Sequence, residues 1–131
     1  MPAAKDSLIV ALDMPNVDEA RTLVHTLGDS VTFYKVGLEL MFAGGLDFAQ
    51  ELRHQGKRVF LDLKLFDVPA TVAGAVRNIR NRGVTFATVH GNQAIMEAAV
   101  GAADGVGILA VTVLTSLDRG DLDDLGFQCD V

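Results

Sequence analysis

Short apolar runs and amphipathic helical segments alternate along this 131-residue chain, and this alternation limits its possible folds more than any other feature. The runs expected to form strands are 8–12, 31–36, 58–63, 85–89 and 107–113. The segments expected to form helices are 17–27, 40–55, 69–82 and 93–103, with a short helix over 118–125. Strands separated by helices are typical of a parallel sheet with crossover helices. The sequence therefore predicts an α/β fold.

Two parallel architectures fit this pattern, an open doubly wound sheet and a (β/α)₈ TIM barrel. The open sheet usually carries a Gly-rich loop after its first strand, and the sequence there is Asp13-Met14-Pro15-Asn16. A barrel gathers functional residues at the carboxyl ends of several strands. Polar residues do stand at those positions, namely Asp13, Lys35, Asp62, Lys64, His90, Thr115 and Ser116.

The barrel interpretation also predicts how much of the fold this chain contains. A complete barrel has eight βα units and about 250 residues, whereas the sequence shows five apolar strands. We therefore expect residues 1–131 to form a single domain, the N-terminal part of a (β/α)₈ barrel with only about the first five βα units.

Composition argues against several classes of partner. The net charge is −6 and there is no basic cluster, which disfavours nucleic acid and anionic membrane surfaces. The longest apolar stretch, 105–114, is too short to span a bilayer, and the N-terminal sequence lacks a signal-peptide pattern. Cys129 is the only cysteine, so an intramolecular disulfide is impossible. These features together predict a cytoplasmic protein without membrane or nucleic-acid partners.

The run from Asp62 to Asp67 carries the strongest chemical signal. Asp62 and Lys64 are two residues apart, so in an extended strand both side chains point to one face. Charges on such a face cost free energy unless they are paired, hydrogen-bonded or used. An isolated pair would indicate a structural ion pair. Because Lys35, Asp13 and Asp67 are expected at the same rim, the sequence favours a catalytic site.

Several motifs, taken in order, resemble the orotidine 5′-phosphate decarboxylase family. They are Ala11-Leu12-Asp13, Phe33-Tyr34-Lys35-Val36-Gly37, Asp62-Leu63-Lys64-Leu65-Phe66-Asp67-Val68-Pro69-Ala70-Thr71, Val89-His90 and Val113-Leu114-Thr115-Ser116. The resemblance implies a cofactor-independent TIM barrel that forms homodimers. It implies conversion of the nucleotide orotidine 5′-phosphate to uridine 5′-phosphate and CO₂, the last step of de novo pyrimidine biosynthesis.

The resemblance also implies roles for individual residues. Lys64 would donate a proton to C6 of the pyrimidine, Lys35 and Asp62 would flank it, and Asp67 would join from the partner subunit. Asp13 and Lys35 would contact the ribose. The complete substrate-binding set implied is Asp13, Lys35, Asp62, Lys64, Asp67, Thr71, Thr115 and Ser116, with Thr71 reaching across the dimer interface and Thr115 and Ser116 facing the base.

The sequence departs from the family at two places. Gly91-Asn92-Gln93 follows His90 where many members carry Ala and a Gly pair, and the family's phosphate-binding loops lie later in the barrel than Val131. Two alternatives therefore stay open. One is a Mg²⁺-dependent decarboxylase of the 3-keto-gulonate 6-phosphate type, which has an acidic metal ligand where this chain has Lys35, a cation that would repel Mg²⁺. The other is an inactive fragment.

The histidines give no metal signal, and we predict neither a metal nor a cofactor. His25, His54 and His90 lack the spacing of metal ligands. His25 and His54 are expected on helix surfaces. His90, at a strand end, is expected to hydrogen-bond a backbone group rather than to act in catalysis.

Overall fold

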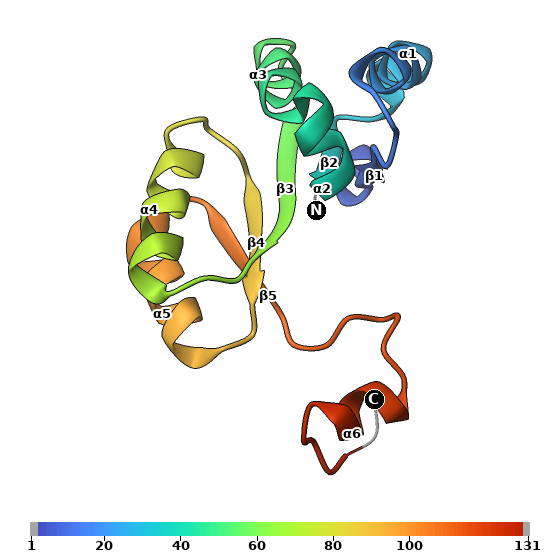
Figure 1. Ribbon diagram of the computed structural model, residues 1–131. Helices are drawn as coiled ribbons and strands as arrows, with labels where there is room; N and C mark the ends of the chain where they lie inside the picture. The colour runs from blue at the N-terminus through green and yellow to red at the C-terminus, as the bar shows by residue number, and fades with distance from the viewer. Residues whose placement is uncertain (1–2, 130–131) are drawn as a thin grey trace.

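The computed structural model describes residues 3–129, which contain one five-stranded sheet in the order β1-β2-β3-β4-β5. All four neighbouring pairs are parallel. The strands are β1 (Val10–Ala11), β2 (Phe33–Gly37), β3 (Arg58–Leu65), β4 (Phe86–His90) and β5 (Gly107–Val111). Helices connect the strands, as Figure 1 shows. The predicted α/β fold with five strand–helix units is confirmed.

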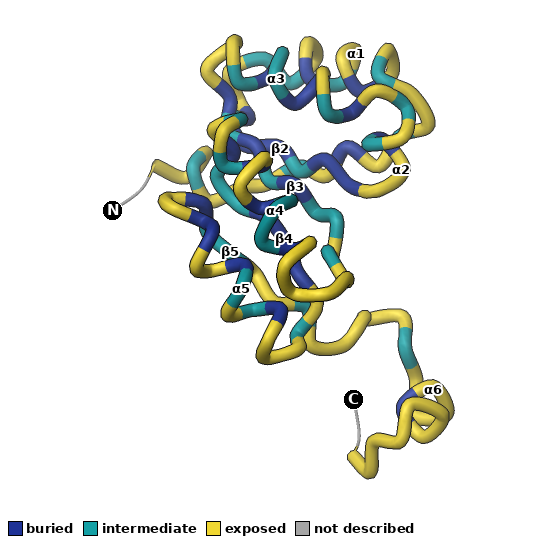
Figure 2. The backbone as a smooth tube through the Cα atoms, turned by 60° about the vertical axis from the view of Figure 1, so that its left-hand side comes forward, coloured by how far each residue is buried: buried dark blue, intermediate teal, exposed yellow. Residues whose placement is uncertain are grey.

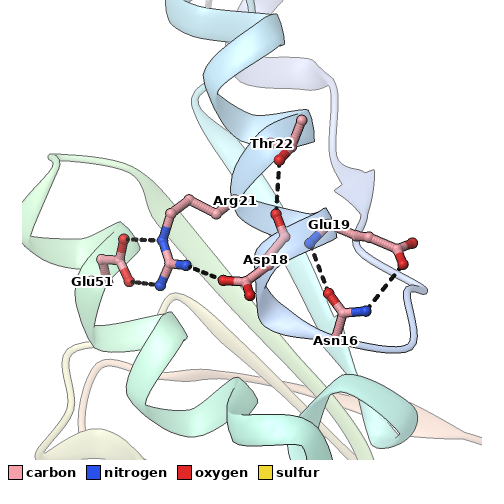
Figure 3. A network of polar contacts seen from close by, with 6 residues as sticks. All are labelled: Asn16, Asp18, Glu19, Arg21, Thr22 and Glu51. Carbon is pink, nitrogen blue, oxygen red and sulfur yellow. Dashed lines mark hydrogen bonds and ion pairs between the residues drawn. The ribbon is translucent and has the colours of Figure 1, made fainter.

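Two of the predicted helices have the expected bounds, whereas those predicted over 69–82 and 118–125 are shorter than expected. The helices are α1 (Val17–Leu27), α2 (Leu38–Leu40), α3 (Leu46–His54), α4 (Pro69–Arg80), α5 (Gln93–Ala103) and α6 (Arg119–Asp124). Asn16 Oδ1 accepts a hydrogen bond from the Glu19 N–H at 2.9 Å and so caps α1 (Figure 3). Both α1 and α5 have the predicted bounds.

The single helix predicted over 40–55 is wrong. The chain instead forms α2, a π-helical segment (Met41–Gly45) and α3. Gly44 has a φ of 97°, a conformation that interrupts regular helix and favours glycine. At Gly45 an added Cβ would lie 2.6 Å from the Leu40 carbonyl oxygen, so the close fold of the chain requires glycine there. The two glycines therefore divide the helix.

Strand ends also differ from the prediction. β1 is only two residues long, and β5 ends at Val111, two residues before the predicted end. β3 continues to Leu65, so Lys64 belongs to the strand and not to the loop after it. Its pairing with β4 is irregular between Leu61 and Leu65, and Lys64 there has a φ of 46°.

The core lies between the sheet and the helices. Tyr34, Val36, Val59 and Leu61 have no exposed surface, and in β2 only Lys35 is not buried. Figure 1 shows α4 and α5 side by side along one side of β4 and β5. Buried positions in Figure 2 follow the sheet-facing side of these helices. Helices α4 and α5 thus pack on one face of the sheet, and the side chains of the opposite face make other contacts.

Aromatic rings cover part of that second face. Phe86 lies 5.7 Å from Phe33 and 6.1 Å from Phe60, measured between ring centroids. The Arg58 guanidinium lies 4.0 Å from the Phe33 centroid, in the position of a cation–π contact. These aromatic residues precede the polar residues Lys35, Asp62 and Thr88 along the same three strands.

The segment with α6 extends away from the sheet (Figure 1), and Figure 2 shows it as mostly exposed. A capping box joins Asp118 and Asp121 at the start of α6, and Leu122 is its one buried residue. The acidic side chains of this segment, Asp118, Asp121, Asp123 and Asp124, are all exposed. None of the helices within residues 3–129 is long and apolar enough to cross a membrane.

Candidate active site

One carboxylate at the carboxyl end of β3 links two lysines. Strand pairing sets Lys35 beside Phe60 and Gly37 beside Asp62, so parallel neighbours put Lys35 and Asp62 on the same face. Lys35 Nζ donates to Asp62 Oδ2 at 3.0 Å, and Lys64 Nζ donates to Asp62 Oδ1 at 2.9 Å. The fold thus brings Lys35, Asp62 and Lys64 together.

Burial differs along this chain of charges. The Asp62 side chain is 12% exposed, Lys35 is 23% exposed and Lys64 is 43% exposed. Asp13, at the end of β1, lies 3.9 Å from Lys35 Nζ and is 65% exposed. Only the middle of the network is therefore shielded within this chain.

Thr88 is a part of the site that sequence reasoning missed. Its hydroxyl donates to Asp62 Oδ1 at 2.8 Å and accepts from the Lys64 N–H at 2.9 Å. Thr88 is 5% exposed in the middle of β4, among Phe86, Ala87 and Val89. A hydroxyl in an otherwise apolar strand was the available signal, but threonine is also common in strands because of its β-branched shape.

The environment of Asp62 favours its charged form. Burial raises the pKa of Asp62, but hydrogen bonds from Lys64, Lys35 and Thr88 together outweigh burial and hold the pKa below its ordinary value. Asp62 is thus a fixed anion between two ammonium groups. Such an arrangement can hold a cation at a defined point beside a bound substrate.

Asp67 and Thr71 lie outside this network in the single chain. Asp67 Oδ1 accepts from the Val68 N–H, and within residues 3–129 Asp67 forms no ion pair. Thr71 stands in the first turn of α4, and both residues are exposed. Both side chains are therefore exposed in this chain, Asp67 in the loop after β3 and Thr71 on α4.

A cavity of about 890 Å³ opens beside Lys64. Its walls come from the ends of β3, β4 and β5 and from the segment that carries α6, including Phe66, His90, Val111 and Leu114. Thr115 and Ser116 occupy the exposed turn after β5 and are not among the lining residues. Within this chain, the cavity brings together Lys64 and apolar surface, while the two hydroxyls remain outside.

The histidines are placed as follows. His25 and His54 are exposed, as predicted. His90 is also exposed, and its ring stacks on Phe66 with the centroids 4.3 Å apart, a contact different from the predicted backbone hydrogen bond. In the part of the chain that the structure describes, no three His, Cys, Asp or Glu side chains are grouped to hold a metal ion.

Comparison of the sequence with protein families gives one match that covers most of the chain. A sequence model described as "Orotidine 5'-phosphate decarboxylase / HUMPS family" matches residues 6–128. The chain is 63% identical over 127 residues to the orotidine 5'-phosphate decarboxylase of Methylococcus capsulatus, covering 96% of this chain and 52% of that protein. It is 52% identical over 129 residues to that of Rhodopseudomonas palustris, covering 97% and 55%.

Solved structures give the same result. The orotidine 5'-phosphate decarboxylase of Lactobacillus acidophilus superposes with a TM-score of 0.84 at 34% identity, covering 94% of this chain and 60% of that one. An uncharacterized conserved protein from Geobacillus kaustophilus gives a TM-score of 0.85 at 35% identity, covering 94% and 62%. The chain therefore spans little more than half the length of the curated relatives reported above.

Proposed function

The chain belongs to the orotidine 5'-phosphate decarboxylase / HUMPS family, and we propose that the full-length protein converts orotidine 5′-phosphate to uridine 5′-phosphate and CO₂, the last step of de novo pyrimidine biosynthesis. Full-length protein here means this chain extended to the length of its curated relatives. The observation that carries the proposal is the Asp62 carboxylate bound to both Lys35 and Lys64. We also propose a cytoplasmic setting, consistent with a single cysteine.

Loss of CO₂ from C6 of the pyrimidine leaves an electron pair in an orbital that the ring does not delocalise well. A fixed cation close to that carbon stabilises the developing charge. Lys64 is proposed for this role, which is supported by its Nζ lying 2.9 Å from Asp62 and by its position in the cavity wall. The ammonium then gives a proton to C6, because lysine is both a compact charge and an acid. No cofactor is needed for this sequence of steps.

Asp62 holds the Lys64 ammonium in place through one carboxylate oxygen, and Lys35 fixes Asp62 through the other. Desolvation favours a neutral lysine, and a neighbouring carboxylate opposes that effect. Enzymes lower barriers by about 8–23 kcal/mol, whereas an exposed ion pair contributes about 0–1 kcal/mol. Because Lys64 is 43% exposed in this chain, the assembled active site must exclude water around it. Substrate and the rest of the full-length protein provide that shielding.

The remaining polar residues are proposed to bind substrate. Asp13, two residues after β1, has its Oδ1 3.9 Å from Nζ of Lys35 in the middle of β2, and both are proposed to reach the hydroxyls of a ribose. Thr115 and Ser116 face the base. Their exposed turn requires the loop after β5 to close over the cavity in the substrate complex.

We propose a homodimer in which Asp67 and Thr71 enter the partner's site. Both side chains are exposed, and within residues 3–129 Asp67 forms no ion pair with a cation of its own chain. Their apolar neighbours Phe66 and Val68 are 72% and 63% exposed, which suits an interface. Mixing the full-length variants Lys64→Ala and Asp67→Ala tests this arrangement. Mixed dimers contain one intact site each, so roughly a quarter of wild-type activity should return; no recovery after subunit exchange would refute it.

The rival function is Mg²⁺-dependent decarboxylation of a keto-sugar phosphate. Lys35 Nζ lies 3.0 Å from Asp62, so a divalent cation bound at Asp62 would meet an ammonium at close range. The deciding experiment measures CO₂ release by the full-length protein from orotidine 5′-phosphate with a metal chelator, and from 3-keto-gulonate 6-phosphate with Mg²⁺. We expect chelator-resistant turnover of the nucleotide. Turnover of the sugar phosphate alone would overturn the proposal.

A further inference from the structure

Thr88 is an exception within its strand. Only Lys57 and Thr88 are buried among the polar and charged residues of the described chain. Lys57 donates to two backbone carbonyls far from the catalytic lysine, Gly28 at 2.7 Å and Val31 at 3.0 Å. The Thr88 hydroxyl instead hydrogen-bonds to two groups of the proposed active site, the Asp62 carboxylate and the Lys64 backbone. Its burial therefore points to a role there.

The backbone at Lys64 explains one of the two contacts. Regular pairing between β3 and β4 is interrupted between Leu61 and Leu65, so Lys64 lies where the ladder is irregular. Its φ of 46° is unfavourable for a residue with a side chain. The Lys64 N–H is held by Thr88 Oγ1 at 2.9 Å. The hydroxyl thus stabilises the strained conformation that aims the Lys64 side chain.

The donors and acceptors around Thr88 balance. A threonine hydroxyl has one proton to donate and two lone pairs to accept with. The proton goes to Asp62 Oδ1 at 2.8 Å, and one lone pair accepts the Lys64 N–H. Oδ1 also receives Lys64 Nζ, while Oδ2 receives Lys35 Nζ. A closed ring of contacts therefore joins the Lys64 backbone, Thr88, Asp62 and the Lys64 ammonium.

We propose that Thr88 is a positioning residue of the decarboxylase, whose single hydroxyl fixes both the Asp62 carboxylate and the main chain that carries Lys64. This inference rests on the proposed function. Thr88 acts through Lys64 and Asp62 and does not itself perform a chemical step. Loss of the hydroxyl would leave the ammonium present but displaced from the reacting carbon.

Two substitutions in the full-length protein separate the hydroxyl from the shape of the side chain. Thr88→Val keeps the branched shape and removes both hydrogen bonds, whereas Thr88→Ser keeps the hydroxyl. Because small displacements of a catalytic group are costly, we expect Thr88→Val to lower kcat by about 10- to 100-fold while KM changes less than about threefold. Thr88→Ser should retain kcat within about threefold of wild type.

Thr26→Val is the matched control for the same chemical change. Thr26 Oγ1 donates to the Thr22 carbonyl on the exposed side of α1, away from the site. This variant should keep wild-type kcat and KM. If Thr88→Val does not fold, as judged by circular dichroism, Thr88→Ala is measured against the same criteria, since it also lacks the hydroxyl.

Amide hydrogen exchange at Lys64 gives a readout that does not depend on turnover. Without its acceptor, the Lys64 N–H should exchange at least about tenfold faster in Thr88→Val than in wild type or Thr88→Ser. If the wild type is active and Thr88→Val has the same kcat and the same Lys64 amide exchange rate as the wild type, the inference is overturned. It is also overturned if Thr88→Ser folds but loses as much kcat as Thr88→Val. An inactive wild type whose Lys64 exchange depends on Thr88 would refute the proposed function and leave the contact supported.

Discussion

At the scale of single residues, Asp62 organises the site. It is the least exposed member of the charge network and receives hydrogen bonds from Lys35, Lys64 and Thr88. The spacing of Asp62 and Lys64 predicted side chains on one face, and the two form an ion pair. It was not sufficient to predict the left-handed backbone at Lys64 or the hydroxyl that supports it, because both depend on the pairing of β3 with a strand more than twenty residues later.

The lowered pKa of Asp62 predicts how stability depends on pH. A carboxyl group with a pKa lower in the folded than in the unfolded state stabilises the fold above the unfolded value, here about 3.8. That contribution is lost as pH falls through the folded pKa. Asp62→Asn should therefore lower the free energy of unfolding of the full-length protein at pH 7, and the difference from wild type should narrow below about pH 4.

Chemical denaturation at a series of pH values checks this prediction. Asp124→Asn is the control, since Asp124 is an exposed carboxylate at the end of α6, away from the network. It should leave the unfolding free energy nearly unchanged. A constant difference between wild type and Asp62→Asn from pH 7 to pH 3 would contradict the assigned pKa direction.

At the scale of elements, local signals predicted only some boundaries. The Asn caps of α1 and α5 stand in the sequence, and both helices have the predicted bounds. The break at Gly44 depends on how the chain folds back against Leu40, and strand ends depend on neighbouring strands. The sequence of a single helix or strand does not show which distant residues it will pack against, so these boundaries could not be predicted.

Contacts between elements are also set by residues far apart in sequence. Arg21 on α1 donates from Nε and Nη2 to both carboxylate oxygens of Glu51 on α3, at 2.9 Å each (Figure 3). The hydrogen bonds from Arg21 lower the pKa of Glu51 despite its partial burial. Both side chains are more than a third exposed, so solvent screens this pair. Core packing under α3, rather than this pair, holds the two helices to the sheet.

The cap of α1 gives a prediction at this scale. Asn16→Ala removes the acceptor for the Glu19 N–H and should lower the free energy of unfolding by about 0.5–2 kcal/mol. Asn16→Asp, which keeps a capping oxygen, is the matched control and should stay near wild type. Equilibrium denaturation monitored by circular dichroism measures both. Equal stability of the Ala and Asp variants would show that the cap does not contribute.

At the scale of the whole molecule, the alternation of strands and helices was predictable because it is repeated five times and each strand is mostly apolar. The positions of the strands in the sheet follow their order in the chain. β1 and β5 are the outer strands of the described sheet, and Leu109 on β5 is 41% exposed. The second face of the sheet is thus only partly covered, which limits what this chain can do by itself.

We predict that residues 1–131 alone decarboxylate orotidine 5′-phosphate very weakly or not at all. The chain spans 52–55% of its relatives, and binding energy from remote parts of a substrate is what orients the reacting ring. The kcat/KM of the 131-residue chain should be at least about 100-fold below that of the full-length protein. The two proteins are compared at equal concentration, with full-length Lys64→Ala as the inactive reference. Equal turnover would refute this prediction.

The account rests on an ammonium held by carboxylates beside the reacting carbon, and the most direct test is the turnover of full-length Lys64→Ala. We predict that kcat for orotidine 5′-phosphate falls by at least about 1000-fold, while binding of uridine 5′-phosphate is partly retained and the exposed-lysine control Lys5→Ala behaves as wild type. A folded Lys64→Ala protein that releases CO₂ at the wild-type rate would contradict the account.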